Sequence, residues 1–253
     1  MMKFISSLLS RLLHAYGNSK TNSNSSGEAP INSIPREVFT EILAKVASAS
    51  LADHFNANQS CKLFHEAGCD NLIFQHASVE QLPIIQWYPK PEISTFLKQC
   101  EEAQNPEVLY RQGMVEFFHN NETELGKELL QKSANLGHVV AAYVLGIILI
   151  DAGDDDEDVL RGKQLLTQKS RCTRNKRSRS GEIDECRKKA KKSIDGMWVN
   201  NSLSGAKKYS CNNLECTARN QTYEADNQVL ECETCNCNKE VAYFYDMLGI
   251  MNN

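Results

Sequence analysis

Four cysteines near the end of the chain have the spacing of a zinc site. Cys211 and Cys216 are separated by four residues, fifteen residues follow, and Cys232 and Cys235 are then separated by two. Thiolate sulfur is a preferred ligand of Zn²⁺, and two cysteines about two to four residues apart let one turn supply two ligands. Because four sulfur ligands leave no open position for water, the spacing predicts a structural rather than a catalytic ion.

Two alternatives stay open at this cysteine cluster. Cys237 competes with Cys235 for the fourth position, and we prefer Cys235 because its two-residue gap is the common one. The other alternative is a set of reduced thiols without metal. No histidine follows His138, which excludes fingers that need a histidine ligand. Between the two pairs, Asp226 and Asn227 separate short apolar segments, which predicts a hairpin.

We find no arrangement of residues that indicates catalysis. The sequence shows no recognisable Ser/His/Asp set, Cys/His pair, phosphate loop or carboxylate pair. His138 follows Gly137 at an expected helix start, and the sequence identifies no partner carboxylate or nucleophile for it. We therefore interpret His138 as a packing residue and predict a protein that is not an enzyme.

A basic stretch covers residues 171–199. Lys176 and Arg177, ten further residues and then Lys188 to Lys192 fit the spacing of a bipartite nuclear import signal. The lysines can equally be the solvated side of a helix, and nucleic-acid contact is a third, less favoured interpretation because no aromatic residue interleaves the run. The helical interpretation rests on apolar residues that share one face, which are Ile183, Cys186, Ala190, Ile194 and Met197.

The composition is that of a globular protein. Hydrophobic residues make up 41% of the 253 positions and the net charge is -4, which argues against disorder or a membrane protein across the whole chain. Five of the ten cysteines fall within residues 211–237, a distribution that favours reduced thiols and one metal site over disulfides. We expect the protein in the nucleus or cytoplasm.

Residues 1–30 form an N-terminal segment that we expect to be flexible. The first sixteen residues are apolar but too short to span a bilayer, and Arg11 interrupts them. A targeting signal and a frayed amphipathic helix are the two interpretations of this stretch. Residues 17–30 are rich in Ser, Asn and Gly and are typical of a linker.

Residues 31–80 predict a small all-α unit of three helices. Pro35 lies in the first turn of a helix whose apolar residues share one face. A second helix is expected from Leu51 to Phe64, with Phe55 among its apolar positions, and a third from Asn71 to His76.

This unit resembles the F-box, whose usual pattern is Leu-Pro-x-Glu-Leu, then Ile-Leu-x-x-Leu, then Cys-Lys-x-Trp. The matching positions are Ile34-Pro35-x-Glu37-Val38, Ile42-Leu43-x-x-Val46 and Cys61-Lys62-x-Phe64. The sequence departs from the pattern by Ile34 for Leu, Phe64 for Trp and Ser60 where Val is common. The resemblance implies docking on a Skp-type adaptor that links F-box proteins to a cullin scaffold. By that resemblance the apolar contacts come from Ile34, Pro35, Val38, Ile42 and Leu43.

Alternatively, the same apolar residues pack on the rest of this chain rather than on a partner.

Residues 105–170 contain an internal repeat, after a linker and capping helix at residues 81–104. Tyr110-x-x-Gly113 recurs as Tyr143-x-x-Gly146, and the phrase GKELLQKS at 126–133 recurs as GKQLLTQKS at 162–170. Such self-similarity is typical of a helical solenoid. Asn105-Pro106 is expected to open the first helix, Asn121 with Glu124 the second, and Gly137 to close it.

Within the linker, Trp87 and Tyr88 lie among prolines, which predicts a rigid strap with the two aromatic rings in the core.

The phrase KSANLGHVVAAYVLG at 132–146 resembles the Sel-like relative of the tetratricopeptide repeat. An F-box, two such repeats and a cysteine-rich tail at residues 200–253 together resemble a group of plant F-box proteins. The resemblance implies that the repeats recruit a target protein, whose identity the sequence does not reveal. It also implies a non-catalytic subunit of a Skp-cullin-F-box ubiquitin ligase.

We expect an all-α protein with a three-helix F-box, a short α-solenoid and a small zinc-ribbon-like C-terminal piece. Two alternative functions remain open. One is a helical-repeat interaction scaffold outside any ligase, and the other is a nuclear zinc-dependent nucleic-acid binder. Of the possible partners, nucleic acid is the less favoured, and a membrane is not expected.

Overall fold

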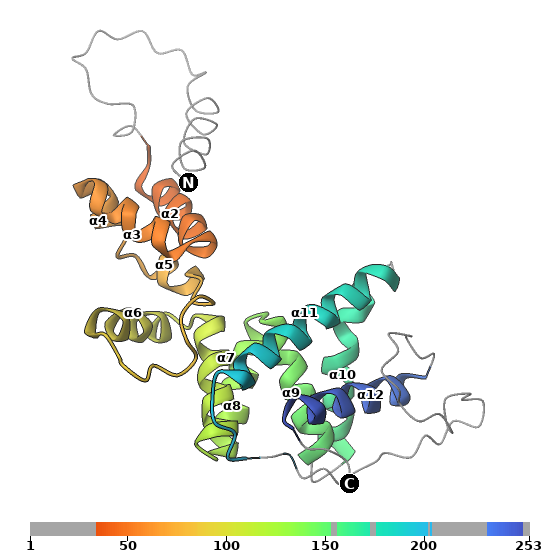
Figure 1. The fold of residues 1–253 in the computed structure, drawn as a ribbon. Coiled ribbons are helices and arrows are strands. Elements are labelled where there is room, and N and C mark those ends of the chain that lie inside the picture. The colour runs from red at the N-terminus through yellow and green to blue at the C-terminus, as the bar shows by residue number, and fades with distance from the viewer. Residues whose placement is uncertain (1–33, 153–155, 173–175, 202, 204–231, 250–253) are drawn as a thin grey trace, which may run out of the picture. The chain divides into compact units, whose positions relative to one another are not determined.

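The computed structural model describes residues 34–152, 156–172, 176–201, 203 and 232–249. Every element of regular structure among these residues is a helix, in agreement with the all-α prediction (Figure 1). The chain divides into two compact units, the first drawn from Met1–Gln81 and Lys90–Asn105 and the second from Leu82–Pro89 and Pro106–Asn253. No described helix is both long and apolar enough to cross a membrane.

The first unit is built around helix α2 (Arg36–Ala49). Its buried face packs against α5 (Asn71–His76) and contacts α3 (Leu51–Ser60) and α4 (Lys62–Ala67). Apolar residues three and four positions apart on α2 form this face, as the sequence pattern predicted. The fully or almost fully buried residues of this unit include Phe39, Leu43, Ala47, Ile73, Ala77 and Val79.

Two expectations for the first unit are corrected. The predicted second helix is divided at Cys61, whose extended backbone (φ -160°, ψ 163°) ends α3 and precedes α4. Helix α6 (Pro91–Glu102), expected to cap the repeats, belongs to this unit because the ring of Phe96 packs against Phe55 and Phe74, at centroid distances of 5.4 and 5.7 Å.

The second unit contains two helical hairpins. Helix α7 (Pro106–Met114), the π-helical turn η2 (Val115–His119) and α8 (Thr123–Asn135) form the first hairpin. Helices α9 (Val139–Ala152) and α10 (Asp156–Cys172) form the second. Helices α11 (Lys176–Asp195) and α12 (Glu233–Met247) pack against α9, so that α9 lies at the centre of the unit (Figure 1).

The recurring glycines mark where the two helices of each hairpin approach closely. A Cβ added to Gly113 would lie 3.1 Å from the carbonyl oxygen of Gly126. The equivalent Cβ at Gly146 would lie 3.1 Å from the carbonyl oxygen of Gly162. Contacts this short leave no room for a larger side chain. The repeated sequence phrases therefore correspond to equivalent packing positions, which explains why both hairpins need the same spacing.

The ends of α8 follow the predicted signals in part. Gly137 adopts a positive φ of 92°, and its N–H and that of His138 donate to the carbonyls of Ala134 and Ser133. This is the Schellman arrangement expected after a helix. At the other end, Asn121 does not cap the helix, because it adopts a φ of 63° and α8 begins at Thr123.

In the strap at Leu82–Pro89, the buried side chains are not the ones that the sequence led us to expect. Ile84 and Ile85 pack against the core of the second unit, whereas Trp87 and Tyr88 are 58% and 93% exposed. The prediction that the two aromatic rings lie in the core is therefore wrong. The two isoleucines fill the space beside the core, which leaves both rings in solvent.

Candidate functional site

The first unit presents an apolar edge where α4 packs on the first turns of α2. The rings of Phe39 on α2 and Phe64 on α4 lie 4.7 Å apart and join the two helices. Pro35 precedes α2 with a φ of -55°, a value to which its ring restricts it, and the missing N–H costs nothing at a helix start. Val38, the residue before Phe39, is half-buried, and Leu63, the residue before Phe64, is 38% exposed. We call Pro35, Val38, Leu63 and Phe64 the α2–α4 edge.

The five residues expected to contact an adaptor do not lie at one depth. Pro35 is exposed, and Ile34 and Val38 are half-buried. Ile42 and Leu43 lie in the core of the unit, with Leu43 only 1% exposed. In this structure, therefore, Ile42 and Leu43 support helix α2, while the other three residues reach the surface. The assignment of all five to an adaptor contact stays a prediction.

Two apolar residues of this unit are exposed, and the sequence patterns did not predict their exposure. Leu63 occupies the variable position of the Cys-Lys-x-Phe phrase, so the pattern gives no information about it. Phe55 was expected among the apolar positions of the second helix, yet it is 42% exposed even though its ring contacts Phe96.

A buried histidine lies on helix α3 of the same unit. Nδ2 of Asn58 lies 3.0 Å from Nε2 of His54, while Nδ1 of His54 and Oδ1 of Asn58 have no partner among the described residues. Burial lowers the pKa of His54 because the charged imidazolium would lose its hydration. The first unit therefore holds a side chain that resists protonation.

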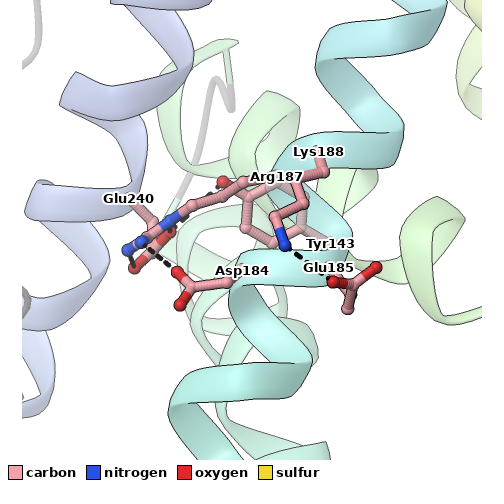
Figure 2. Close-up of polar contacts among 6 residues, drawn as sticks. All are labelled: Tyr143, Asp184, Glu185, Arg187, Lys188 and Glu240. Atoms are coloured by element: carbon pink, nitrogen blue, oxygen red, sulfur yellow. Dashed lines mark hydrogen bonds and ion pairs between the residues drawn. The ribbon is translucent and has the colours of Figure 1, made fainter.

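The second unit contains a polar cluster between α9, α11 and α12 (Figure 2). Nη2 of Arg187 donates to Oε1 of Glu240 over 2.6 Å, and Nε donates to Oε2 over 3.0 Å. The hydroxyl of Tyr143 donates to the same carboxylate over 3.2 Å. A second carboxylate, that of Asp184, accepts from Nη1 of Arg187 over 2.8 Å. The guanidinium also lies 4.1 Å from the ring centroid of Tyr243.

Burial and charge act together on the pKa values of this cluster. Burial, reinforced by the negative charge of Glu240, raises the pKa of Tyr143 well above its usual value. Burial alone would lower the pKa of Arg187, but its hydrogen bonds to Glu240 together with the negative charges of Glu240 and Asp184 outweigh this effect and raise it. Tyr143 is thus neutral and Arg187 charged, so both groups present hydrogen-bond donors to one carboxylate.

His138 has a carboxylate partner that the sequence did not reveal. Its Nε2 lies 2.8 Å from Oε2 of Glu107, and its ring stacks on Tyr110 at a centroid distance of 4.8 Å. The N–H of Ala141 donates to Nδ1 of His138, so Nδ1 carries no proton and Nε2 donates to Glu107. The cluster fastens α9 to α7 and contains no nucleophile, which agrees with a packing role.

The predicted zinc ligands are only partly within the described residues. Cys211 and Cys216, and the hairpin expected after them, lie outside. Cys232 immediately precedes α12 and Cys235 lies in its first turn, so this pair sits on a helix rather than on a ribbon of strands. Burial raises the pKa of the nearby Cys237 thiol to about 12, so that the free thiol is protonated at neutral pH. No group of three potential metal-binding side chains gathers within the described part of the chain.

Comparison with known proteins identifies the repeats and their relatives. Residues 80–195 match the family described as plant tetratrico peptide repeats. A putative F-box protein of Arabidopsis thaliana is 26% identical over 191 residues, which cover 76% of this chain and 62% of the relative. A second Arabidopsis F-box protein is 25% identical over 74% of this chain and 48% of its own length.

A third Arabidopsis F-box protein is 24% identical over 207 residues, or 79% of this chain and 60% of the relative. The chain therefore spans less than two thirds of each of these three relatives. No solved structure matches the chain.

Proposed function

We propose that this chain, which resembles plant F-box proteins with helical repeats, recruits a target protein to a Skp-cullin-F-box ubiquitin ligase. The first unit docks on a Skp-type adaptor, and the second binds the target. The proposal rests chiefly on the α2–α4 edge, where Pro35 and Leu63 are exposed and Val38 and Phe64 are half-buried. The relatives named above, all F-box proteins, support the same role at low identity.

The α2–α4 edge suits docking because its two helices are already packed against each other in the free chain. Packing between Phe39 and Phe64 fixes α4 against α2 before any partner arrives. Exposed Leu63 and Pro35 then offer apolar surface that loses contact with water on binding. A preorganised surface avoids part of the entropy cost of association, so a small patch can contribute substantially to affinity.

In this proposal the chain performs no bond chemistry. Its effect on reaction rate comes from tethering, since a target held beside the ligase meets it at a high effective concentration. The histidine with the best-defined partner, His138, stacks and caps within the repeats rather than facing a reacting group. The alternative function of a repeat scaffold outside any ligase shares these features and differs only in lacking the adaptor contact.

We also propose that Cys211, Cys216, Cys232 and Cys235 hold a structural zinc ion. The described pair fits half of such a site, because Cys232 and Cys235 lie one helical turn apart at the start of α12. The ion would fasten the segment before α12 to that helix.

The alternative of a nucleic-acid binder has less support. Lysines on the exposed side of α11 pair with acidic residues of their own helix, as in Lys188 with Glu185 and Lys191 with Asp195. Such pairs reduce the charge available to phosphate groups. The face of α11 predicted to be apolar is indeed buried, at Cys186, Ala190 and Ile194.

Co-purification of the full chain with a Skp-type adaptor tests the proposal. The native chain is expected to retain the adaptor through gel filtration, and the Leu63→Asp variant to lose it. Because Leu63 is exposed, the substitution should leave the helical content unchanged. Failure of the native chain to retain any Skp-type adaptor would leave the scaffold alternative.

A further inference from the structure

Helix α12 lies outside the repeats that it packs against. The match to plant tetratrico peptide repeats ends at residue 195, whereas α12 begins at Glu233. Nevertheless, α12 contacts α9, α10 and α11, and Figure 1 shows it beside them. A later segment of the chain therefore covers a face of the repeat unit.

An aromatic side chain anchors α12 in this face. Phe244 is completely buried, and its ring centroid lies 5.8 Å from that of Phe118 and 6.4 Å from that of Tyr143. Val241 and Tyr245, on the same side of α12, are buried as well. Without α12, the side chains that now contact Phe244, among them Phe118 and Tyr143, would form an apolar site for one aromatic ring of a helix. We call this site the aromatic seat.

The polar contacts of Glu240 with Arg187 and Tyr143, which we call the clasp, lie one helical turn before Phe244. Glu240 accepts hydrogen bonds from Arg187 and Tyr143, neither of which belongs to α12 (Figure 2). Buried ion pairs contribute little net stability compared with apolar packing, and in some proteins they select one partner and one register. The clasp and the aromatic seat together recognise a carboxylate followed four residues later by an aromatic ring on one helical face.

We infer that the face of α9 and α11 under α12 is a helix-binding groove, and that α12 occupies it as a built-in competitor. The partner it fits is an amphipathic helix of a target protein with Glu or Asp four residues before Phe. The inference deepens the proposed function, on which it rests for the role of the target. Adaptor binding plays no part in the groove itself.

The covalent connection gives α12 an advantage over any free helix. A tethered segment competes at an effective concentration of roughly millimolar. A free helix of equal intrinsic affinity therefore binds the native chain weakly and binds strongly once the resident helix is weakened. This difference separates a displaceable helix from a permanent part of the core.

Peptide binding to the full chain tests the inference. The probe is a fluorescent peptide of residues 232–249, kept reduced, and the opened chain carries Glu240→Lys with Phe244→Ala in its own α12. We expect the opened chain to bind the peptide on the order of a hundredfold more tightly than the native chain does. A peptide that itself carries Glu240→Lys is the matched control and should bind the opened chain poorly.

A charge exchange tests the clasp directly. A chain with Arg187→Glu and Phe244→Ala should prefer the Glu240→Lys peptide over the native peptide, because the two charges are exchanged. The same preference in both chains would overturn the assignment of Arg187. No binding of the native peptide to an opened chain that keeps its helical circular dichroism would overturn the groove.

Hydrogen exchange of the native chain covers the case in which the opened chain unfolds. Amides of α12 should exchange through an opening that requires less free energy than the opening that exposes α9. Exchange of α12 and α9 together, only through global unfolding, would show that α12 is a permanent part of the core. None of these three experiments involves a Skp-type adaptor, so loss of adaptor binding and loss of the groove are distinguishable.

Discussion

The guanidinium of Arg187 and the carboxylate of Glu240 form two hydrogen bonds, of 2.6 and 3.0 Å, between helices α11 and α12. Both side chains are largely withdrawn from solvent, with exposed fractions of 15% and 12%. The pair joins residues that are 53 positions apart in the sequence, so it connects α12 to the repeats rather than stabilising one helix.

Removing one member of this pair should destabilise the second unit. Arg187→Met leaves the Glu240 carboxylate buried without its cation, and we expect a loss of about 3 kcal/mol in unfolding free energy. The double variant Arg187→Met, Glu240→Met should recover most of that loss, because neither charge remains. Urea unfolding of the two single variants and the double variant measures the coupling. Additive losses would contradict a direct interaction.

The close contact of Gly126 on α8 with η2 should not tolerate a methyl group. A Cβ at Gly126 would lie 2.6 Å from Cβ of Phe117 and 2.7 Å from its backbone nitrogen. We expect Gly126→Ala to lower the unfolding free energy by roughly 1–3 kcal/mol. Gly181→Ala is the matched control, since nothing lies within 4 Å of a Cβ there and alanine favours a helix. Equal effects of the two substitutions on thermal unfolding would argue against the close approach.

Acid should weaken the first unit through His54. Burial lowers the pKa of His54 below its ordinary value of 6.5, so the unfolded chain binds a proton that the folded chain resists. The unfolding free energy should therefore fall as the pH drops below 6.5, down to the folded pKa. His54→Gln should remove that part of the pH dependence in urea unfolding.

The exposed His76 of α5 provides the matched control for this experiment. His76→Gln should retain the native loss of stability on acidification. An unchanged pH dependence in His54→Gln would show that other groups cause the acid sensitivity.

A structural zinc ion should be measurable in the full chain. We expect about one zinc per chain by atomic absorption, and a loss of that zinc on Cys232→Ser. Cys61→Ser is the control because Cys61 is exposed and is not one of the predicted ligands. A native chain that binds no zinc after reducing purification with added zinc would contradict the site.

Local patterns in the sequence predicted much of the fold. The apolar spacing of α2, the Gly137 helix end and the recurring glycines all reflect contacts within one helix or between neighbouring helices. The repeat of Tyr-x-x-Gly could be found because each copy performs the same packing role. Such signals depend on residues that are close in the sequence.

Contacts between distant residues could not be predicted in the same way. Glu107 meets His138 from 31 positions away, and Glu240 meets Tyr143 from 97 positions away. Neither pair belongs to a periodic pattern, since their approach depends on the three-dimensional packing of whole helices. For the same reason, the sequence did not distinguish the buried Leu43 from the exposed Leu63 at the candidate docking surface.

The affinity of the full chain for a Skp-type adaptor tests the central claim most directly. Calorimetry should show binding by the native chain, and Val38→Asp should weaken it by about 2 kcal/mol, or roughly thirtyfold. Leu125→Asp is the matched control because Leu125 is an exposed leucine of the second unit. Selective loss in Val38→Asp is the result we predict. Equal affinity of the native chain and both variants, or no binding by the native chain, would contradict adaptor docking through the α2–α4 edge.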